Sequence, residues 1–369
     1  MLLNGRPART IWEAEDHGRG LLPDVLILDQ TRLPHAVETV RLTTLDGAVH
    51  AIAAMQVRGA PLIGVAAAYG LALALRADAS DGGLERACAA LLASRPTAVN
   101  LAWAIARVGT VVRPLAPADR AEAAYAAARE MAEEDVETCR RLGEHGAALI
   151  AAAAARNGGR PVQVLTHCNA GWLATVDWGT ALAPIYQARR RGLDVHVWVD
   201  ETRPRNQGAG LTAFELGQEG VPYTLVVDNA GGHLMQRGRV DLCLVGSDRT
   251  TRTGDVANKI GTYLKALAAA DTGTPFYAVL PSSTVDWRLR DGVRDIPIEE
   301  RSGREVTHVI GRAPSGEAVE VEVAAPGARV ANPAFDVTPA RLVTGLVTER
   351  GVCAADEAAL AALYPDQAG

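Results

Sequence analysis

Short apolar runs alternate with helical patterns through the second half of the chain. The runs recur at roughly 20–35 residue spacing. They are VQVLT (162–166), VHVWV (195–199), TLVV (224–227), LCLVG (242–246) and FYAVL (276–280). Helical patterns lie between them, at about residues 172–191, 210–219, 230–238 and 256–270. Strands that alternate with helices in this way are typical of βαβ units, so this half predicts an α/β fold with a parallel sheet covered on both faces.

The first half combines short extended segments with apolar helices. Residues 1–50 indicate short strands, and LLPDVLILDQ (21–30) is the clearest apolar run. After Arg58-Gly59-Ala60-Pro61, the segment IGVAAAYGLALALRA is rich in Ala and Leu, which suits a buried helix. Residues 94–100 carry Pro and Thr just before LAWAIARV, where a helix start is expected. These patterns predict a smaller α+β domain over residues 1–119.

A long helical stretch separates the two halves. Residues 120–156 are rich in Ala and Glu and contain no Pro. They show no sustained heptad, so a helix connecting two domains is favoured over a coiled coil. The second domain is then predicted to cover residues 157–369.

Composition narrows the class of protein. The chain has 369 residues, of which 48% are hydrophobic and 22% charged, as in folded proteins of about two domains. A net charge of -6 argues against general binding to nucleic acid or anionic membrane, but it allows a local basic pocket for a small phosphate. The five cysteines form no CxxC pair, zinc pattern or disulfide framework. The charged N-terminus lacks the apolar run of a signal peptide, and no uncharged apolar stretch is long enough to span a membrane, so we expect a cytoplasmic protein.

Reactive residue types follow the predicted strands. Ligands of open parallel sheets bind outside the carboxyl ends of the strands. The segments at those ends are His167–Gly171, Asp200–Gly208, Asp228 with Asn229, and Ser247–Arg249. This coincidence predicts an enzyme site at that edge of the sheet.

Cys168 and Asp248 are the two candidates for chemistry. A tight turn at Gly171 would place Cys168 near a helix N-terminus, which stabilises a thiolate, although free cysteines are more often inert core residues. Asp248, held between apolar strands, would have the raised proton affinity of a general acid or base. Its alternative is an ion pair with Arg249 or a helix cap. His167 points to the opposite face from Cys168 and is interpreted as a packed, hydrogen-bonded residue.

The acidic pair Asp200 and Glu201 is interpreted as structural, in salt bridges with nearby arginines.

Two further segments are suited to binding an anion. Arg58-Gly59-Ala60-Pro61 offers a charge, close backbone approach and a helix start. Residues 254–262 indicate a loop that enters a helix and carries Lys259. No P-loop or GxGxxG follows a strand, and no HExxH or His/Cys cluster is present, so neither a nucleotide nor a metal is predicted.

Six ordered blocks closely resemble the methylthioribose-1-phosphate isomerase family of methionine salvage. This family is related to the regulatory subunits of the guanine nucleotide exchange factor of translation initiation. The blocks are RGAPLIGVAAAYG (58–70), THCNAG (166–171), DETRPRNQGA (200–209), GSDRTTRTGDVANKIGTY (246–263), IPIEERSGREVTH (296–308) and NPAFDVTPARLVTGLVTERGV (332–352). The resemblance implies a small N-terminal domain, a Rossmann-like C-terminal domain and a homodimer that uses neither metal nor nucleotide.

The resemblance also implies the reaction and its residues. The aldose 5-methylthioribose 1-phosphate becomes the ketose 5-methylthioribulose 1-phosphate, with Cys168 and Asp248 as the catalytic pair. Asp248 would assist ring opening, and Cys168 would act at C1 and C2, as a base or in support of a hydride shift. Substrate contacts fall on Arg58, Gly59, Ala60, Arg95, Gln207, Asn258 and Lys259, of which Arg95 and Gln207 come from the resemblance alone.

Departures from the family pattern leave alternatives. Ser247, the polar residues 250–253, Gly210 and Trp172 stand where the family shows other residue types. Trp172 could reshape the pocket for the C5 substituent, so 5-deoxyribose 1-phosphate is an alternative substrate. Ribose 1,5-bisphosphate would need additional cations. A non-catalytic regulatory relative is disfavoured, because the chain keeps Cys168, Asp248 and the Arg58 segment. A nicotinamide-dependent dehydrogenase lacks its glycine fingerprint here.

Overall fold

A seven-stranded sheet forms the centre of the C-terminal half in the computed structural model, which describes residues 1–16, 22–95 and 99–367. Its strand order is β18-β17-β12-β9-β6-β7-β8, and all neighbours are parallel except β17 and β18. The strands are β6 (Val162–Thr166), β7 (Val195–Asp200), β8 (Tyr223–Val226), β9 (Leu242–Val245), β12 (Phe276–Val279), β17 (Gly345–Thr348) and β18 (Gly351–Cys353). The predicted α/β class with a Rossmann-like parallel sheet is therefore confirmed, and all five apolar runs are strands of this sheet.

Helices cover both faces of this sheet. One face packs against the second half of α5 and against α6 and α7, and the other packs against α8, α9 and α12. Two separate apolar clusters result, one on each side of the strands. The helices are α5 (Pro117–Ala154), α6 (Ala183–Arg190), α7 (Ala213–Gln218), α8 (Ala230–Gln236), α9 (Thr262–Thr272) and α12 (Glu357–Leu363).

The N-terminal part has its own core. A three-stranded antiparallel sheet packs with four helices and the first half of α5 around a cluster of Ala, Leu, Ile and Val. The elements are β3 (Ile11–Glu13), β4 (Val25–Leu28), β5 (Thr39–Leu42), α1 (Leu45–Ala53), α2 (Ala60–Ala77), α3 (Asp81–Ser94) and α4 (Val99–Val112). The predicted helix start at Pro96 and Thr97 lies outside the described residues.

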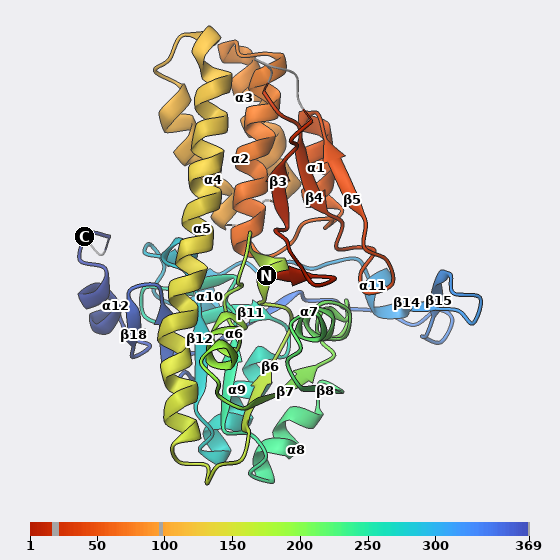
Figure 1. Cartoon of the computed structure of the whole chain (residues 1–369), viewed down its shortest axis with the longest axis vertical. Helices are drawn as coiled ribbons and strands as arrows, with labels where there is room; N and C mark the ends of the chain where they lie inside the picture. Colours follow the sequence, from red (N-terminus) through yellow and green to blue (C-terminus); the bar gives the residue numbers. More distant parts are fainter. Residues whose placement is uncertain (17–21, 96–98, 368–369) are drawn as a thin grey trace.

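Helix α5 belongs to both cores and runs along the whole molecule (Figure 1). Met131 packs in the N-terminal cluster, whereas Leu142 and Ile150 pack under the sheet. At Gly146 a Cβ atom would lie 2.3 Å from Pro184 Cγ, so glycine is what lets α6 approach this closely. This helix covers the stretch for which the sequence predicts a connecting helix. The domain boundaries themselves stay a prediction, since Met1, Leu28 and Leu33 pack in the core under the sheet.

Smaller elements surround the carboxyl edge of the large sheet. A four-stranded sheet has the order β13-β10-β11-β16, and a hairpin of β14 and β15 projects from the side of the molecule (Figure 1). These and the remaining elements are β1 (Leu2–Leu3), β2 (Arg6–Pro7), β10 (Arg249–Thr251), β11 (Val256–Lys259), β13 (Val285–Asp286), α10 (Gly292–Asp295), α11 (Arg304–Thr307), β14 (His308–Arg312), β15 (Ala318–Glu322) and β16 (Phe335–Thr338).

Two predicted helices begin later than their sequence patterns indicate. In residues 172–191, only a 3-10 turn at Trp172–Ala174 precedes α6, because tertiary partners hold the backbone between them. Thr10 Oγ1 donates to Thr175 O at 2.5 Å, for example. In residues 256–270, the first four residues are β11, which pairs with β10 and β16. Local periodicity carries no information about these partners.

Helix α2 is the one helix of the described chain with the length and apolar composition of a membrane span. Of its residues, 72% are buried inside the protein. Its apolar character is thus accounted for by packing in the N-terminal core.

Asp135 links α5 to the segment after Ala174 by a hydrogen bond. Its carboxylate accepts a hydrogen bond from Val176 N at 2.7 Å. Burial raises the pKa of Asp135 from its ordinary 3.8 to about 7.

We expect this carboxyl to make stability fall between about pH 4 and pH 7. Its pKa is higher in the folded than in the unfolded state, so the unfolded chain releases the proton first as the pH rises. In Asp135→Asn the free energy of unfolding should depend less on pH across this window. Urea unfolding at several pH values measures it.

Glu137→Gln on the same helix is the control. Hydrogen bonds from Arg140 and Arg141 lower the pKa of Glu137 from 4.5 to about 2, so its contribution to stability varies with pH mainly below this window, and Glu137→Gln should leave the pH dependence within the window unchanged. Equal pH dependence of the wild-type protein and Asp135→Asn would contradict the expectation.

Candidate active site

Cys168 lies directly beyond β6, in a left-handed backbone conformation with φ of +66°. Its side chain is buried, and this burial raises the pKa of the thiol, whereas the nearby charges of Arg58 and Lys259 lower it. The prediction that Cys168 lies near the N-terminus of an α-helix is wrong, because a 3-10 turn follows Gly171. Positive charge near Cys168 comes from Arg58 and Lys259 and not from helix amides. Their effect on the thiol pKa is smaller than that of burial, so the neutral thiol is favoured.

Asp248 lies beyond β9, and its charge affects the pKa of Cys168. Burial raises the pKa of Asp248, while the charges of Lys259, Arg95 and Arg58 favour its ionised form. The Asp248 charge in turn raises the pKa of Cys168, so the two groups lie within electrostatic reach of each other. Neither alternative for Asp248 is realised: Arg249 pairs with Asp286 at 3.9 Å, and strand β10 follows in place of a helix.

Lys259 at the end of β11 supplies the buried positive charge. It is 7% exposed, and burial lowers the pKa of its ammonium, whereas Cys168 and Asp248 favour the charged form. Its Nζ lies 4.6 Å from the centroid of the Phe335 ring. The chain contains only two lysines, and the other, Lys265, is also buried. Both lysine ammonium groups of the chain are therefore buried inside the protein.

Arg58 reaches the same region from the N-terminal half. Its Nη1 donates to Asn169 Oδ1 at 2.5 Å and its Nη2 donates to Asn169 O at 2.7 Å. Asn169 Nδ2 donates to Thr212 Oγ1 at 3.1 Å and to the carboxylate of Glu215. Glu215 is fully buried and also accepts Trp172 N at 2.7 Å, and burial raises its pKa to about 7. The Arg58 guanidinium is therefore oriented through a buried chain of hydrogen bonds.

Gly59 and Ala60 begin α2 at the contact between the two halves. Gly59 has a φ of +97°, and a Cβ atom there would lie 2.4 Å from Ala174 O. Both the conformation and the contact require glycine. The N-terminus of α2, with the amides of its first turn, is thereby held against the turn that follows Cys168.

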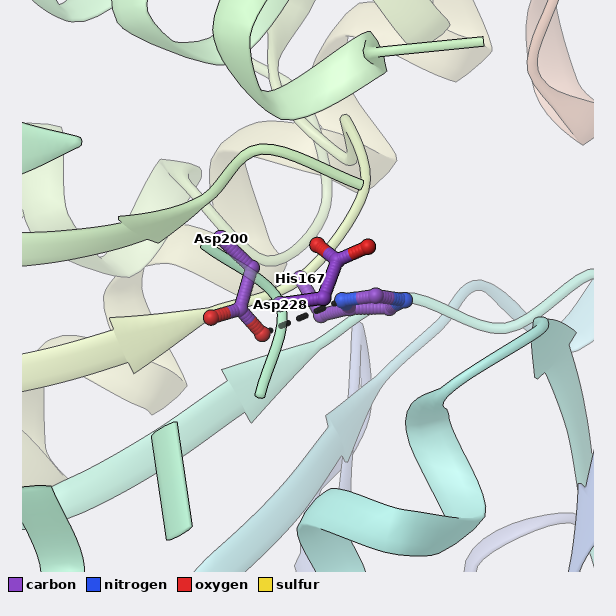
Figure 2. Close-up of side chains that lie close together, drawn as sticks. All are labelled: His167, Asp200 and Asp228. Carbon is purple, nitrogen blue, oxygen red and sulfur yellow. Dashed lines mark hydrogen bonds and ion pairs between the residues drawn. The ribbon is translucent and has the colours of Figure 1, made fainter. Parts of the chain in front are cut away.

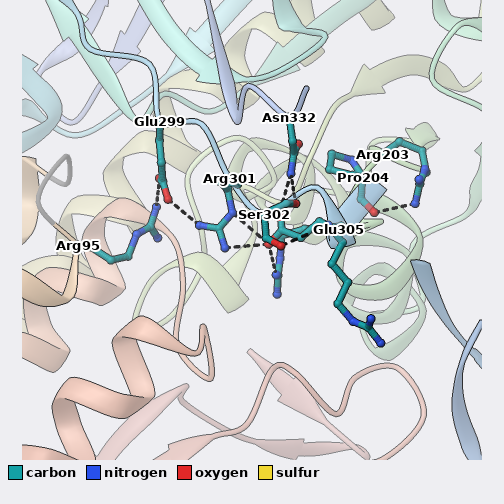
Figure 3. A network of polar contacts seen from close by, with 10 residues as sticks. Arg95, Arg203, Pro204, Glu299, Arg301, Ser302, Glu305 and Asn332 are labelled. Carbon is teal, nitrogen blue, oxygen red and sulfur yellow. Dashed lines mark hydrogen bonds and ion pairs between the residues drawn. The ribbon is translucent and has the colours of Figure 1, made fainter. Parts of the chain in front are cut away.

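Arg95 is held by a network of alternating charges (Figure 3). Its Nη2 lies 3.4 Å from Glu299 Oε2, and Arg301 Nη1 donates to Glu299 Oε1 at 2.8 Å. Arg301 also pairs with Glu305, which accepts from Arg205 Nη1 at 2.7 Å. Arg95 Nε is buried without a hydrogen-bond partner in the described part of the chain, so a donor is available for a ligand.

Gln207 and Asn258 occupy different settings. Gln207 is 6% exposed, and its Oε1 is unpaired among the described residues. Asn258 on β11 donates from Nδ2 to Thr262 Oγ1 at 3.0 Å. The predicted anion site at the start of α9 is wrong as a helix N-terminus, because Asp336 accepts the amides of Gly261 and Tyr263. The protein's own carboxylate therefore occupies the position that the predicted anion would take.

Two cavities include the predicted residues. The larger, of about 570 Å³, is lined by Arg58, Gln207, Gly210 and the hairpin residues Val309 and Ile310, among others. The smaller, of about 40 Å³, is lined by Ala60, Arg95 and Asp248, with Ile63, Ile296 and Phe335 as its apolar wall. The expectation that Trp172 reshapes the pocket for the C5 substituent is wrong. This side chain is fully buried in the core under the sheet and lines neither cavity.

His167 belongs to a cluster with Asp200 and Asp228, in which His167 and Asp200 are buried (Figure 2). Its Nδ1 lies 3.1 Å from Asp200 Oδ2, and its Nε2 lies 2.8 Å from Ile260 O. Lys265 Nζ lies 3.1 Å from the same Asp200 oxygen. The salt-bridge partner of Asp200 is therefore this lysine and not one of the nearby arginines that the sequence predicted. His167, Asp200 and Asp228 have the residue types of a metal site, but the Lys265 ammonium already supplies the cation beside Asp200. His167 is thus packed and hydrogen-bonded, as interpreted from the sequence, whereas Asp200 pairs with His167 and Lys265 in place of the predicted arginines.

Several residues at this edge are not identifiable as site residues from the sequence. Asn169, Thr202 and Arg301 stand inside the recognised blocks but carried no signal of their own. Glu215 lies outside every block, and only its burial against Asn169 makes it part of the site. Hydrogen bonds between residues more than 40 positions apart are not visible in a single sequence.

The chain belongs to the initiation factor 2 subunit family, whose model matches residues 56–355. Among its members, the chain is 66% identical over 367 residues to methylthioribose-1-phosphate isomerase of Methylobacterium nodulans, covering 100% of this chain and 99% of that protein. The solved structure of 5-methylthioribose 1-phosphate isomerase from Pyrococcus horikoshii is 37% identical, with a TM-score of 0.82 and coverage of 98% and 97%. Translation initiation factor eIF-2B, subunit delta, from A. fulgidus is 36% identical, with a TM-score of 0.78 and coverage of 97% and 100%.

Proposed function

We propose that this protein is an aldose–ketose isomerase that converts 5-methylthioribose 1-phosphate to 5-methylthioribulose 1-phosphate in methionine salvage. The relatives that carry this name match the whole chain at high identity. The observation that carries the chemistry is that Cys168 and Lys259 are both buried at the carboxyl edge of the sheet, where the charges of Asp248 and Arg58 influence the pKa of each. A regulatory relative would have no need for a buried thiol and acid among cations.

The proposed substrate contacts are those that can hold a phosphate and hydroxyl groups. Arg58, Lys259 and Arg95 supply positive charge, and the first turn of α2 at Gly59 and Ala60 supplies amides. Gln207 and Asn258 would bind hydroxyl groups of the sugar. The unpaired Gln207 Oε1 and Arg95 Nε support these roles, because buried polar atoms normally have partners.

The anomeric phosphate sets the chemical problem. It prevents the sugar ring from opening freely to an aldehyde, so the ring oxygen must be protonated as its bond to C1 breaks. Asp248 is the proposed acid, because burial raises its pKa and favours the protonated carboxyl. After it has given its proton to the ring oxygen, its carboxylate can accept the proton of the 2-hydroxyl group as the ketone forms at C2. The proton balance of Asp248 then closes over one turnover.

Hydrogen moves from C2 to C1 in the same reaction, so C2 is oxidised and C1 is reduced without an external redox partner. Cys168 is the proposed group beside these carbons. Burial raises the pKa of its thiol, so a role as base would first require loss of the thiol proton. A hydride shift has no such requirement. The buried neutral thiol therefore supports the hydride route.

We further propose that the protein acts as a homodimer in the cytoplasm and does not bind nucleic acid or membranes. The resemblance to the isomerase family supports the dimer. The net charge of -6 supports the absence of a general interaction with polyanions.

The function is tested by ketose formation from three synthetic sugars: 5-methylthioribose 1-phosphate, 5-deoxyribose 1-phosphate and ribose 1,5-bisphosphate. We expect the highest kcat/KM with the first. Higher kcat/KM with either of the others would reassign the C5 substituent. No ketose from any of the three would overturn the enzymatic function in favour of a regulatory one.

Cys168→Ser and Asp248→Asn should each lower kcat by about 100-fold or more, because each removes a group proposed to act in the chemical step. Cys353→Ser is the matched control, since Cys353 lies half-buried on β18. Steady-state kinetics and circular dichroism of all three variants separate catalysis from folding. A residue whose variant turns over at the wild-type rate has no part in the mechanism.

Turnover in D2O distinguishes the two routes of hydrogen transfer. A hydride shift carries the C2 hydrogen directly to C1, so the ketose should contain no solvent deuterium at C1. Proton transfer through a side chain that exchanges with solvent would introduce it. NMR of the product measures the deuterium at C1, and complete incorporation would assign Cys168 the role of base.

A further inference from the structure

Cys168 and Thr202 are among the non-glycine residues at the candidate site that hold left-handed backbone conformations. Cys168 has a φ of +66° and Thr202 has a φ of +64°. L-residues with side chains adopt this region at a cost in free energy, and such residues gather at functional sites when surrounding contacts over-determine them. The contacts that hold Cys168 are therefore of interest.

Two buried threonine hydroxyls hold the backbone of Cys168 from both sides. Cys168 N donates to Thr202 Oγ1 at 2.8 Å, and Thr212 Oγ1 donates to Cys168 O at 2.7 Å. Both threonines are fully buried, so water cannot replace either hydrogen bond. We call Thr202 and Thr212 the hydroxyl clamp.

The Thr202 side of the clamp is itself anchored to the sheet. Its Oγ1 donates to Asp200 O at 3.0 Å, and Asp200 is the last residue of β7. Thr202 N donates to Asp228 Oδ1 at 2.5 Å, and Thr202 O accepts from Asn206 N at 2.8 Å. The hydroxyl that receives the Cys168 amide thus has its own donor used and its backbone tied at two points.

We infer that Thr202 and Thr212 are positioning residues that hold the Cys168 backbone in its left-handed conformation and thereby direct the thiol toward the site. The conformation of a residue sets the direction of its Cα–Cβ bond, so relaxation to an ordinary φ would turn the thiol away from Asp248 and Lys259. The inference rests on the proposed function, because it assigns these threonines a role through Cys168.

The two threonines should differ in their effects. Thr202 contacts Cys168 and backbone groups, whereas Thr212 Oγ1 also accepts from Asn169 Nδ2, and Asn169 orients Arg58. Loss of the Thr202 hydroxyl should therefore lower kcat with little change in KM. Loss of the Thr212 hydroxyl should lower kcat and also raise KM, because the proposed phosphate ligand Arg58 is disturbed.

The test compares Thr202→Val, Thr202→Ser and Thr212→Val by steady-state kinetics with 5-methylthioribose 1-phosphate. Valine keeps the shape of threonine and leaves the Cys168 amide unpaired. We expect kcat of Thr202→Val to fall about 10- to 100-fold with KM within about threefold, the rate equivalent of an unpaired buried donor. Serine keeps the hydroxyl and should restore kcat to within about threefold of wild type.

Thr338→Val is the matched control, since Thr338 is fully buried and its hydroxyl has no hydrogen-bond partner in the described chain. Its kcat should remain at the wild-type value. Equal losses in Thr202→Val and Thr338→Val, or no rescue by serine, would reduce the clamp to general packing and overturn the inference. If Thr202→Val does not fold, the combined kcat and KM change of Thr212→Val decides.

A second measurement does not depend on turnover. The rate at which iodoacetamide alkylates Cys168, followed by mass spectrometry of the peptide, reports the placement of the thiol. It should change in Thr202→Val while alkylation of the half-buried Cys353 does not. Unchanged alkylation together with unchanged kcat overturns the clamp. If instead Cys168→Ser is fully active and alkylation changes, the clamp holds the thiol but the proposed chemistry fails.

Discussion

The paired hydrogen bonds between Arg58 and Asn169 are the interaction on which the site depends. They join the start of α2 to the residue after Cys168, and Gly59 permits the contact because no side chain could fit against Ala174. Through them the N-terminal half covers the carboxyl edge of the large sheet. Without this contact the thiol and the acid would face water, and the cations around them would be screened.

Burial then decides the protonation of the reactive groups. It raises the pKa of both Cys168 and Asp248 and lowers that of Lys259, while the attraction of Lys259 to each of the two acids opposes these shifts. A carboxyl with a raised pKa suits proton donation in ring opening, and a neutral thiol suits a reaction in which hydrogen crosses between neighbouring carbons. Helix amides would have favoured a thiolate instead. The difference between the predicted and the observed surroundings of Cys168 therefore bears on the mechanism.

Much of the fold was predictable, because strand and helix periods are local properties. The five apolar runs and the long helix were found in the places that their patterns indicate. The segments after Gly171 and before Thr262 were misjudged, since their backbones bond to residues far along the chain, such as Thr10 and Phe335. At the site, Cys168, Asp248 and Lys259 could be named from residue type and strand position, whereas Asn169, Glu215 and Arg301 could not.

The amino-acid sequence by itself determined the class of fold, the candidate thiol and acid, and the resemblance to an isomerase family, because these depend on residue types in a fixed order. Only the tertiary structure decided which groups act on one another. It placed Lys265 beside Asp200, filled the start of α9 with Asp336, and enclosed Trp172 in the core. The physical reason is that charge, burial and hydrogen bonding depend on distance in space, and separation along the chain does not specify that distance.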